Sequence, residues 1–336
     1  PLPRQPRTGS TRWREAKRVK TNAVLQGGDR ARLIKRLLMS YGSMMALALI
    51  FIVFSLATPN FLSLSNLTLM LGQISVVGVI AFGATFVLIL GGLDLSIMGI
   101  PGFVGSLVAM LMSKGMGTVP AIAIGLCTGA LLGLINGLFA VKLRVGIIYS
   151  GLAMAWIARG LDLWVSNYGP IFDGVRVNAP FLWLGQGKIG NIPAIFLIFL
   201  VLFIILHFTM TKTPFGRNMY AIGGSEDGAK ACGIDIDHYK LIGLCISGLF
   251  SAIGGILITA KAGGSMPRVG EGVWFNVLLA VLFGTTVLTG GVAHILGTAV
   301  GVLFTGVLLN GFTQLNVHEF DQAVIQGVLI VAAVFM

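Results

Sequence analysis

The stretch TPFGRNMYAIGGSEDGAKACGIDIDHYK, residues 213–240, is a long polar passage between two apolar segments at 193–210 and 241–260. Within it, Ser225 is predicted to begin a short helix, because a serine side chain accepts hydrogen bonds from the free backbone N–H groups at a helix start. The segment therefore reads as a folded element set between two membrane spans.

The residues after Ser225 support this prediction. Glu226 and Asp227 fall in the first turn, where acidic groups suit the positive end of the helix dipole. Gly233 suits the left-handed turn that ends a helix. Because a helix of about two turns is not stable alone in water, we expect a partner protein to hold it. The alternative is a capped surface helix in an ordinary loop.

Composition places the chain in a membrane. Of its 336 residues 56% are hydrophobic and only 10% are charged, whereas a soluble domain carries about 25% charged residues. We therefore predict an all-α, polytopic transmembrane helical bundle of about ten spans, each of about 20 residues. The expected spans are 37–57, 67–90, 95–113, 119–141, 146–165, 193–210, 241–260, 273–289, 292–312 and 321–336.

Basic residues orient the bundle. Eleven Lys and Arg residues precede residue 37. With a cytoplasmic N-terminus, seventeen of the 23 Lys and Arg residues fall inside and five outside, in line with the positive-inside rule. This orientation places 211–240 in the cytoplasm and 166–192 outside. Residues 1–36 are expected to form a disordered cytoplasmic tail that contacts anionic membrane lipid and no nucleic acid, while 37–336 form the transmembrane domain.

Motifs for catalysis and cofactor binding are missing. The sequence has no GxxxxGK[ST] phosphate loop, no metal-ligand spacing and no catalytic serine turn. Its three cysteines do not have the spacing of metal ligands, and we interpret them as small hydrophobic residues. We therefore expect no catalytic residue, no metal and no cofactor on this chain.

One carboxylate stands out within the apolar segments. Asp94, in GGLDLSIMGIPG at 91–102, is the only acidic residue between Leu37 and Leu161. Charged groups at membrane depth are costly and face a cavity or a partner, and so many glycines indicate unwound backbone. One interpretation is a re-entrant turn beside a substrate path that includes Gly91, Gly92, Asp94 and Ser96. The other is an ordinary turn in which Asp94 caps the next helix.

A second glycine-rich break, GTTVLTGGVAHILGT at 284–298, echoes the first, because FGAT at 82–85 and FGTT at 283–286 each precede a Gly-Gly pair. Breaks in corresponding halves would suit a transporter built from repeats, which adds Gly290 and Gly291 to the predicted substrate path. Arg159 and Asp162 are expected to form an internal ion pair at i, i+3. Asn136 and Asn310, each followed by glycine, are interpreted as span ends.

Four motifs carry a family resemblance from about residue 40 onward. They are GGLDLS at 91–96, NGLFAVKLRV at 136–145, TPFGRNMYAIGG with GAKACGI at 213–234, and GGVAHILGT at 290–298. In this order and spacing the chain resembles the permease subunit of bacterial ATP-binding-cassette (ABC) sugar importers of the ribose/galactose/xylose group. The chain departs from the family pattern at Ile97–Gly99, at VGIIYSGLA (145–153) and at Gly228. These departures bear on the identity of the substrate more than on the fold.

The resemblance implies a multi-pass inner-membrane subunit that translocates a pentose, hexose or polyol. It implies a cytoplasmic ABC ATPase holding ATP and Mg, a periplasmic substrate-binding protein, and a second permease copy or paralogue as partners. The ATPase-coupling residues would be Gly223, Gly224, Ser225, Glu226, Asp227, Gly228, Ala229, Lys230 and Gly233, with Ala229 at the contact face. Alternatives are an ABC permease for nucleosides or an autoinducer, and an ion-coupled secondary carrier. A membrane scaffold without transport would leave the glycine breaks unexplained.

Overall fold

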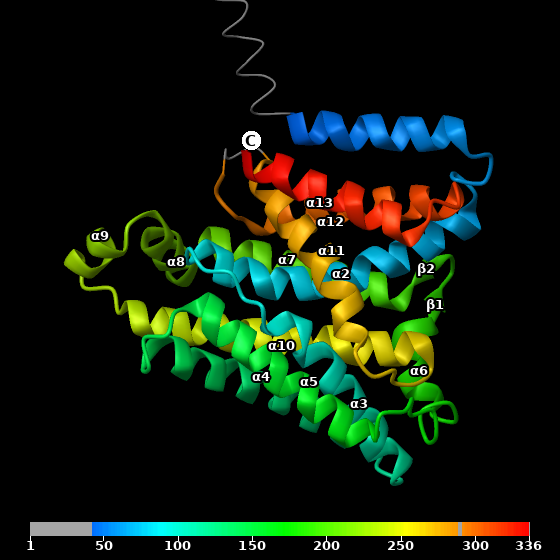
Figure 1. Ribbon diagram of the computed structural model, residues 1–336, viewed down its shortest axis with the longest axis horizontal. Helices are drawn as coiled ribbons and strands as arrows, with labels where there is room; N and C mark the ends of the chain where they lie inside the picture. Colours follow the sequence, from blue (N-terminus) through cyan, green and yellow to red (C-terminus); the bar gives the residue numbers. More distant parts are fainter. Residues whose placement is uncertain (1–41, 288–290, 336) are drawn as a thin grey trace, which may run out of the picture.

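The computed structural model describes residues 42–287 and 291–335, so the basic tail at 1–36 and Gly290 lie outside the described residues. The described part is an all-α bundle, as predicted (Figure 1). Its ten longer helices are Gly42–Ala57, α2 (Leu64–Ile89), α3 (Ile100–Ser113), α4 (Thr118–Val141), α5 (Ile147–Ser166), α7 (Ala194–Lys212), α10 (Ile236–Ala262), α11 (Val269–Thr285), α12 (Ile295–Gln314) and α13 (Glu319–Phe335).

Each expected span therefore has a helix in the same place along the chain. Five of them (α2, α4, α7, α10 and α12) are long and apolar enough to cross a membrane, and three shorter apolar helices accompany them. The number of spans stays a prediction. One boundary is wrong, because the expected span at 95–113 becomes helical only at Ile100, after a short 3₁₀ turn η1 (Ser96–Met98).

Helix α2 forms the centre of the bundle. It packs against α10 on one side and against α7, α11 and α12 on others (Figure 1). Most of its residues are buried, including Phe82 and Phe86. A helix that is apolar on every side and also shielded by neighbours sits in the interior of a large helical protein. Helices α3, α4 and α5 complete the layer beyond α10.

Glycines allow α4 and α10 to approach closely. A side chain at Gly129 would lie 2.7 Å from the Gly248 carbonyl oxygen, and one at Gly133 would collide with the carbonyl of Leu244. Small residues let helix backbones meet in membranes, where packing replaces the hydrophobic effect as the driving force. The glycine content of the spans thus serves helix packing.

Asn310 is not a span end, which corrects that interpretation. It is 5% exposed within α12, and its side-chain amide exchanges two hydrogen bonds with that of Asn66 in α2, at 2.8 and 2.9 Å. Gln314 also donates to Asn66 at 2.9 Å. Buried amides are stable when paired in this way, so the pair joins α2 to α12.

Short elements fill the connections. Helix α6 (Ala179–Gln186) and a hairpin of β1 (Lys188–Ile189) and β2 (Ile192–Pro193) lie between α5 and α7. The polar segment after α7 forms α8 (Pro214–Gly224) and α9 (Glu226–Ala231). Only the second of these was predicted. Helix α8 begins with Pro214 after Thr213, whose hydroxyl accepts a hydrogen bond from Gly216 N at 3.4 Å.

Orientation gives the first testable prediction. In a chain without its native cysteines, we expect Asp227→Cys to react with a membrane-impermeant maleimide only from the cytoplasm, and Lys188→Cys only from outside. The reason is that the excess of basic residues places 211–240 on the cytoplasmic side. Labelling of both sites in inside-out and right-side-out vesicles measures it. Reaction at position 227 from outside would show that the predicted topology is inverted.

Candidate functional site

The chain leaves helical geometry between α2 and α3. Gly91 has a φ of +80°, which favours glycine. A side chain at Gly92 would lie 2.6 Å from Cδ1 of Ile147 at the start of α5. The unwound segment, residues 90–99, is therefore a packed break between two helices, which we call the helix break.

Asp94 organises this helix break. Its side chain is 2% exposed, and its Oδ1 accepts hydrogen bonds from Ser96 N at 2.9 Å and from Asn136 Nδ2 at 3.2 Å. Helix α3 begins after Gly99 without a side-chain cap. Asp94 therefore does not cap α3, but its Oδ1 binds the N–H of Ser96, the first residue of η1, so the interpretation of Asp94 as a turn-and-cap residue stays a prediction. Asn136 is not a span end, because α4 continues to Val141. A role for Asp94 in a substrate path stays a prediction.

The surroundings of Asp94 are polar although they lie in the core. The side chains of Ser96 and Ser247 also form hydrogen bonds with Asp94, so hydroxyl and amide groups from η1, α4 and α10 surround this one carboxylate. A buried carboxylate is stable only where such polar groups pair with it.

The predicted helix after Ser225 is confirmed. Ser225 Oγ accepts a hydrogen bond from Gly228 N at 3.1 Å, and Glu226 and Asp227 occupy the first turn of α9. Gly233 follows the helix with a φ of +78°. The local sequence therefore encodes this helix through its cap, its acidic first turn and its terminating glycine.

Ala229 of α9 faces the interior of the chain and not the solvent. Ala229 is only 3% exposed and belongs to the hydrophobic core of the chain, near Ile234, whose N–H donates to the Ala229 carbonyl at 3.1 Å. The placement of Ala229 at an outer contact face is therefore wrong, because α9 folds back onto its own chain. The other predicted coupling residues are exposed: Gly223, Gly224, Ser225, Glu226, Asp227, Gly228, Lys230 and Gly233.

The helix break and the α8–α9 segment meet. A side chain at Gly223 would collide with the carbonyl of Ile89, the last residue of α2. A cavity of about 280 Å³ is lined by Gly91 and Gly92 on one side and by Glu226 and Lys240 on the other. The helix break and the α8–α9 segment, which lie far apart in the sequence, therefore line one cavity.

An ion pair beside this cavity holds α9 against α10. Lys240 Nζ lies 2.7 Å from Glu226 Oε1 and joins α9 to the beginning of α10. The pair is partly exposed, so its contribution to stability is about 0–1 kcal/mol. Its geometric effect is to hold the first turn of α9 against α10.

At the other end of the bundle, the expected pair of Arg159 and Asp162 does not form. Arg159 Nε contacts Glu271 Oε1 at 2.9 Å. Asp162 accepts hydrogen bonds from Ser106 Oγ at 2.5 Å and from Arg268 N at 2.8 Å. Residues of α3 and of the beginning of α11 thus satisfy both charges, and each of the two side chains on α5 has its own partners.

The second glycine-rich break is also present, since α11 ends at Thr285 and α12 begins at Ile295. Gly291 has a φ of +101°. Beside it, Thr298 and Thr85 of α2 share a hydrogen bond of 2.7 Å between their hydroxyl groups. This break therefore packs against the C-terminal half of α2.

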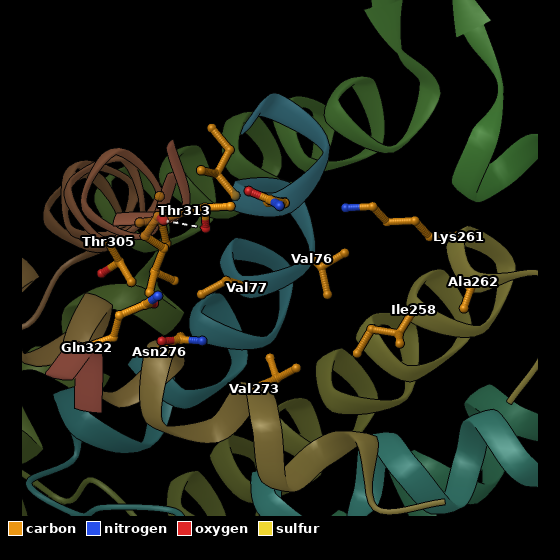
Figure 2. Close-up of a pocket in the computed structure, with 15 residues that line it drawn as sticks. Val76, Val77, Ile258, Lys261, Ala262, Val273, Asn276, Thr305, Thr313 and Gln322 are labelled. Atoms are coloured by element: carbon orange, nitrogen blue, oxygen red, sulfur yellow. Dashed lines mark hydrogen bonds between the residues drawn. The ribbon is translucent and has the colours of Figure 1, made fainter. Parts of the chain in front are cut away.

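A larger cavity lies in the other half of the bundle, with a volume of about 610 Å³ (Figure 2). Helices α2, α10, α11, α12 and α13 line it. Its polar side chains are Gln73, Lys261, Asn276, Thr305, Thr313 and Gln322. Sequence reasoning missed it, because each polar residue is isolated on a different apolar helix. None of the predicted path residues that the structure describes lines this cavity.

Together, these elements define an all-helical membrane protein. Residues 66–334 match the model of the family described as "branched-chain amino acid transport system / permease component". The chain belongs to this permease family and is a multi-pass protein of the bacterial inner membrane.

Individual relatives are similar over nearly their whole length. The ribose import permease of Bacillus subtilis is 37% identical over 88% of this chain and 91% of its own. The ribose import permease of Escherichia coli is 31% identical over 90% and 94%. The L-arabinose ABC transporter permease of Azospirillum brasilense is 32% identical over 87% and 86%. No solved structure matches.

The helix break gives the second prediction. Asp94→Ala removes the acceptor of two buried donors, and we expect a loss of about 1–3 kcal/mol in stability for each donor left unsatisfied. Asp94→Asn keeps an oxygen acceptor, so we expect it to assemble normally but to reduce uptake. Thermal unfolding in detergent and uptake in cells measure the two effects. Wild-type uptake by the Asn variant would limit Asp94 to holding the turn.

Proposed function

We propose that this chain is the membrane-spanning subunit of an ABC importer that translocates a monosaccharide or a related small polar solute. A pentose, a hexose or a polyol would fit this class. The observation that carries the proposal is the contact between the exposed α8–α9 segment and the helix break at the end of α2. Similarity to ribose and arabinose permeases supports the choice of solute.

The proposal requires partners. A cytoplasmic ABC ATPase would hold ATP and Mg and would contact α9. A periplasmic substrate-binding protein would deliver the solute, and a second permease copy or a paralogue would complete the path across the membrane. No cofactor is assigned to this chain, and catalysis of ATP hydrolysis is assigned to the ATPase.

The geometry suggests how coupling works. ATP binding would pull α9 through its exposed residues. The ion pair of Glu226 and Lys240 would pass this movement to α10, and the close contact of Gly223 with Ile89 would pass it to α2. For ATP to drive the change, the ATPase must bind the two permease states with different affinity.

An ion-coupled carrier is the rival from another class. Such a carrier needs a chain of ionisable groups through the membrane. Among the described residues, the two buried acidic side chains, Asp94 and Asp162, accept hydrogen bonds from hydroxyl, amide and backbone groups, and Asp162 also lies near Glu271. This pattern favours the ABC importer. Nucleosides or an autoinducer remain the alternative solutes within the proposal.

Coupling gives the third prediction. Ala231 lies exposed at the last turn of α9, where a cation suits the helix dipole. Ala231→Arg should therefore keep the helix but obstruct docking, because a bulky side chain at a tight contact costs about 1–3 kcal/mol. We expect loss of ATPase binding or of coupled uptake, with normal membrane insertion. Pull-down of the ATPase together with an uptake assay measures both.

Two comparisons sharpen this experiment. Lys188→Arg, on the opposite side of the bundle in β1, is the matched control and should behave as wild type. Ala229→Arg should disturb α9 itself, because position 229 is buried within the chain. An intact complex with full uptake in the Ala231→Arg variant would make the α8–α9 segment an ordinary loop.

A further inference from the structure

We propose that the 610 Å³ cavity between α2 and α10–α13 is a solute-binding site within a single permease chain, and that Lys261 is its main hydrogen-bond donor. The site would take a hydroxylated solute of monosaccharide size that carries no positive charge. The proposal rests on the proposed import function and adds the place and the chemistry of recognition.

The size and lining of the cavity suit such a solute. Small-molecule sites usually measure about 300–1,000 Å³ and combine apolar walls with a few polar groups. Here Ile74, Val77, Ile258 and Val302 supply apolar walls from three helices. A sugar ring also has apolar C–H faces and a polar rim, so walls and solute correspond.

The polar groups of the cavity differ in what they offer. Thr305 and Thr313 donate their hydroxyl hydrogens to carbonyls of their own helix, Gly301 O and Leu309 O, both at 2.9 Å, and so present acceptor oxygens to the cavity. Gln322 donates through Nε2 to Val317 O at 2.8 Å, which leaves its carbonyl oxygen as an acceptor. These three residues can accept hydrogen bonds from hydroxyl groups.

The donors come from the other helices. Asn276 Nδ2 makes only a long contact of 3.4 Å with Gly272 O. Gln73 lines the cavity from α2. Lys261 extends its side chain from α10 into the space towards α2 (Figure 2). Donors and acceptors therefore face one space from different helices, as a ring of hydroxyl groups requires.

Lys261 also sets the charge of the cavity. The described residues that line the cavity include no Asp or Glu, so its ammonium group meets no carboxylate there. Gly72 leaves room for it, since a Cβ at that position would lie 3.6 Å from Lys261 Nζ. A partly buried ammonium group is stabilised by oxygen acceptors. The cavity therefore favours an oxygen-rich solute and repels a cation.

The position of the cavity in the bundle suits an import function. With the predicted orientation, most of the lining residues lie in the outer halves of their helices, and Val77 and Val302 lie just past the midpoints of α2 and α12. The bundle tightens beyond Val77, because a Cβ at the next residue, Gly78, would lie only 2.7 Å from Cδ2 of Phe199 and 3.2 Å from Val302. A solute released from outside would reach this cavity before it meets the closed inner half.

Two variants test the site in the full complex of permease, ATPase and binding protein. Lys261→Met removes the ammonium group but keeps the apolar stem, and Val273→Trp fills the cavity from α11. Uptake of radiolabelled D-ribose and L-arabinose into proteoliposomes gives kcat/KM for each sugar. We expect at least a tenfold decrease for both variants with the transported sugar, with normal ATPase binding and basal ATP hydrolysis.

Lys188→Met, which removes a lysine from the exposed hairpin on the same side, is the control and should transport as wild type. If the wild-type complex transports either sugar and both variants match it, the cavity is not the solute site, while the import function stands. If the wild-type complex transports neither sugar, nor a radiolabelled hexose or polyol tested in the same way, the proposed import function is wrong, and this inference falls with it.

Discussion

A backbone that stops being helical inside a membrane must still satisfy its polar groups, because lipid offers none. The helix break after α2 meets this constraint locally. Gly91 N and Gly92 N donate to Leu88 O and Val87 O, each at 3.0 Å, and Asp94 accepts from Ser96 N. Asn136 reaches the same carboxylate from α4. One carboxylate therefore joins the helix break to α4, and the position of the break beside α4 depends on it.

The same break gives the proposed coupling its physical route. Helix α2 ends where the α8–α9 segment begins to press on it, at Ile89 and Gly223. It also runs through the bundle to the 610 Å³ cavity, where Gln73 and Ile74 form part of the wall. In the proposed mechanism, a movement applied at α9 would reach this cavity through α2. The contact at Ile89 needs glycine at position 223, because a side chain there would hold α8 and α2 apart.

Much of this could be predicted from local sequence. The apolar segments, the cap at Ser225 and the terminating Gly233 depend on neighbouring residues only, and they were predicted correctly. Asp94 could be singled out because it is the only carboxylate in a long apolar stretch. The burial of Ala229 could not be predicted, since the side of a six-residue helix that faces its own chain is set by the tertiary fold. The pairing of Arg159 with Glu271 and the outer cavity likewise depend on how distant helices meet.

The central claim is that α9 and the helix break move as one unit. Spin labels at Leu93→Cys and Lys230→Cys, in a chain without its native cysteines, allow the distance between them to be measured by double electron–electron resonance. A second sample, labelled only at Lys230→Cys, reports the distance between the two permease copies. The account predicts that ATP binding by the full complex changes the distance between the copies and leaves the distance within one chain unchanged. A change within one chain as large as that between the copies would contradict it.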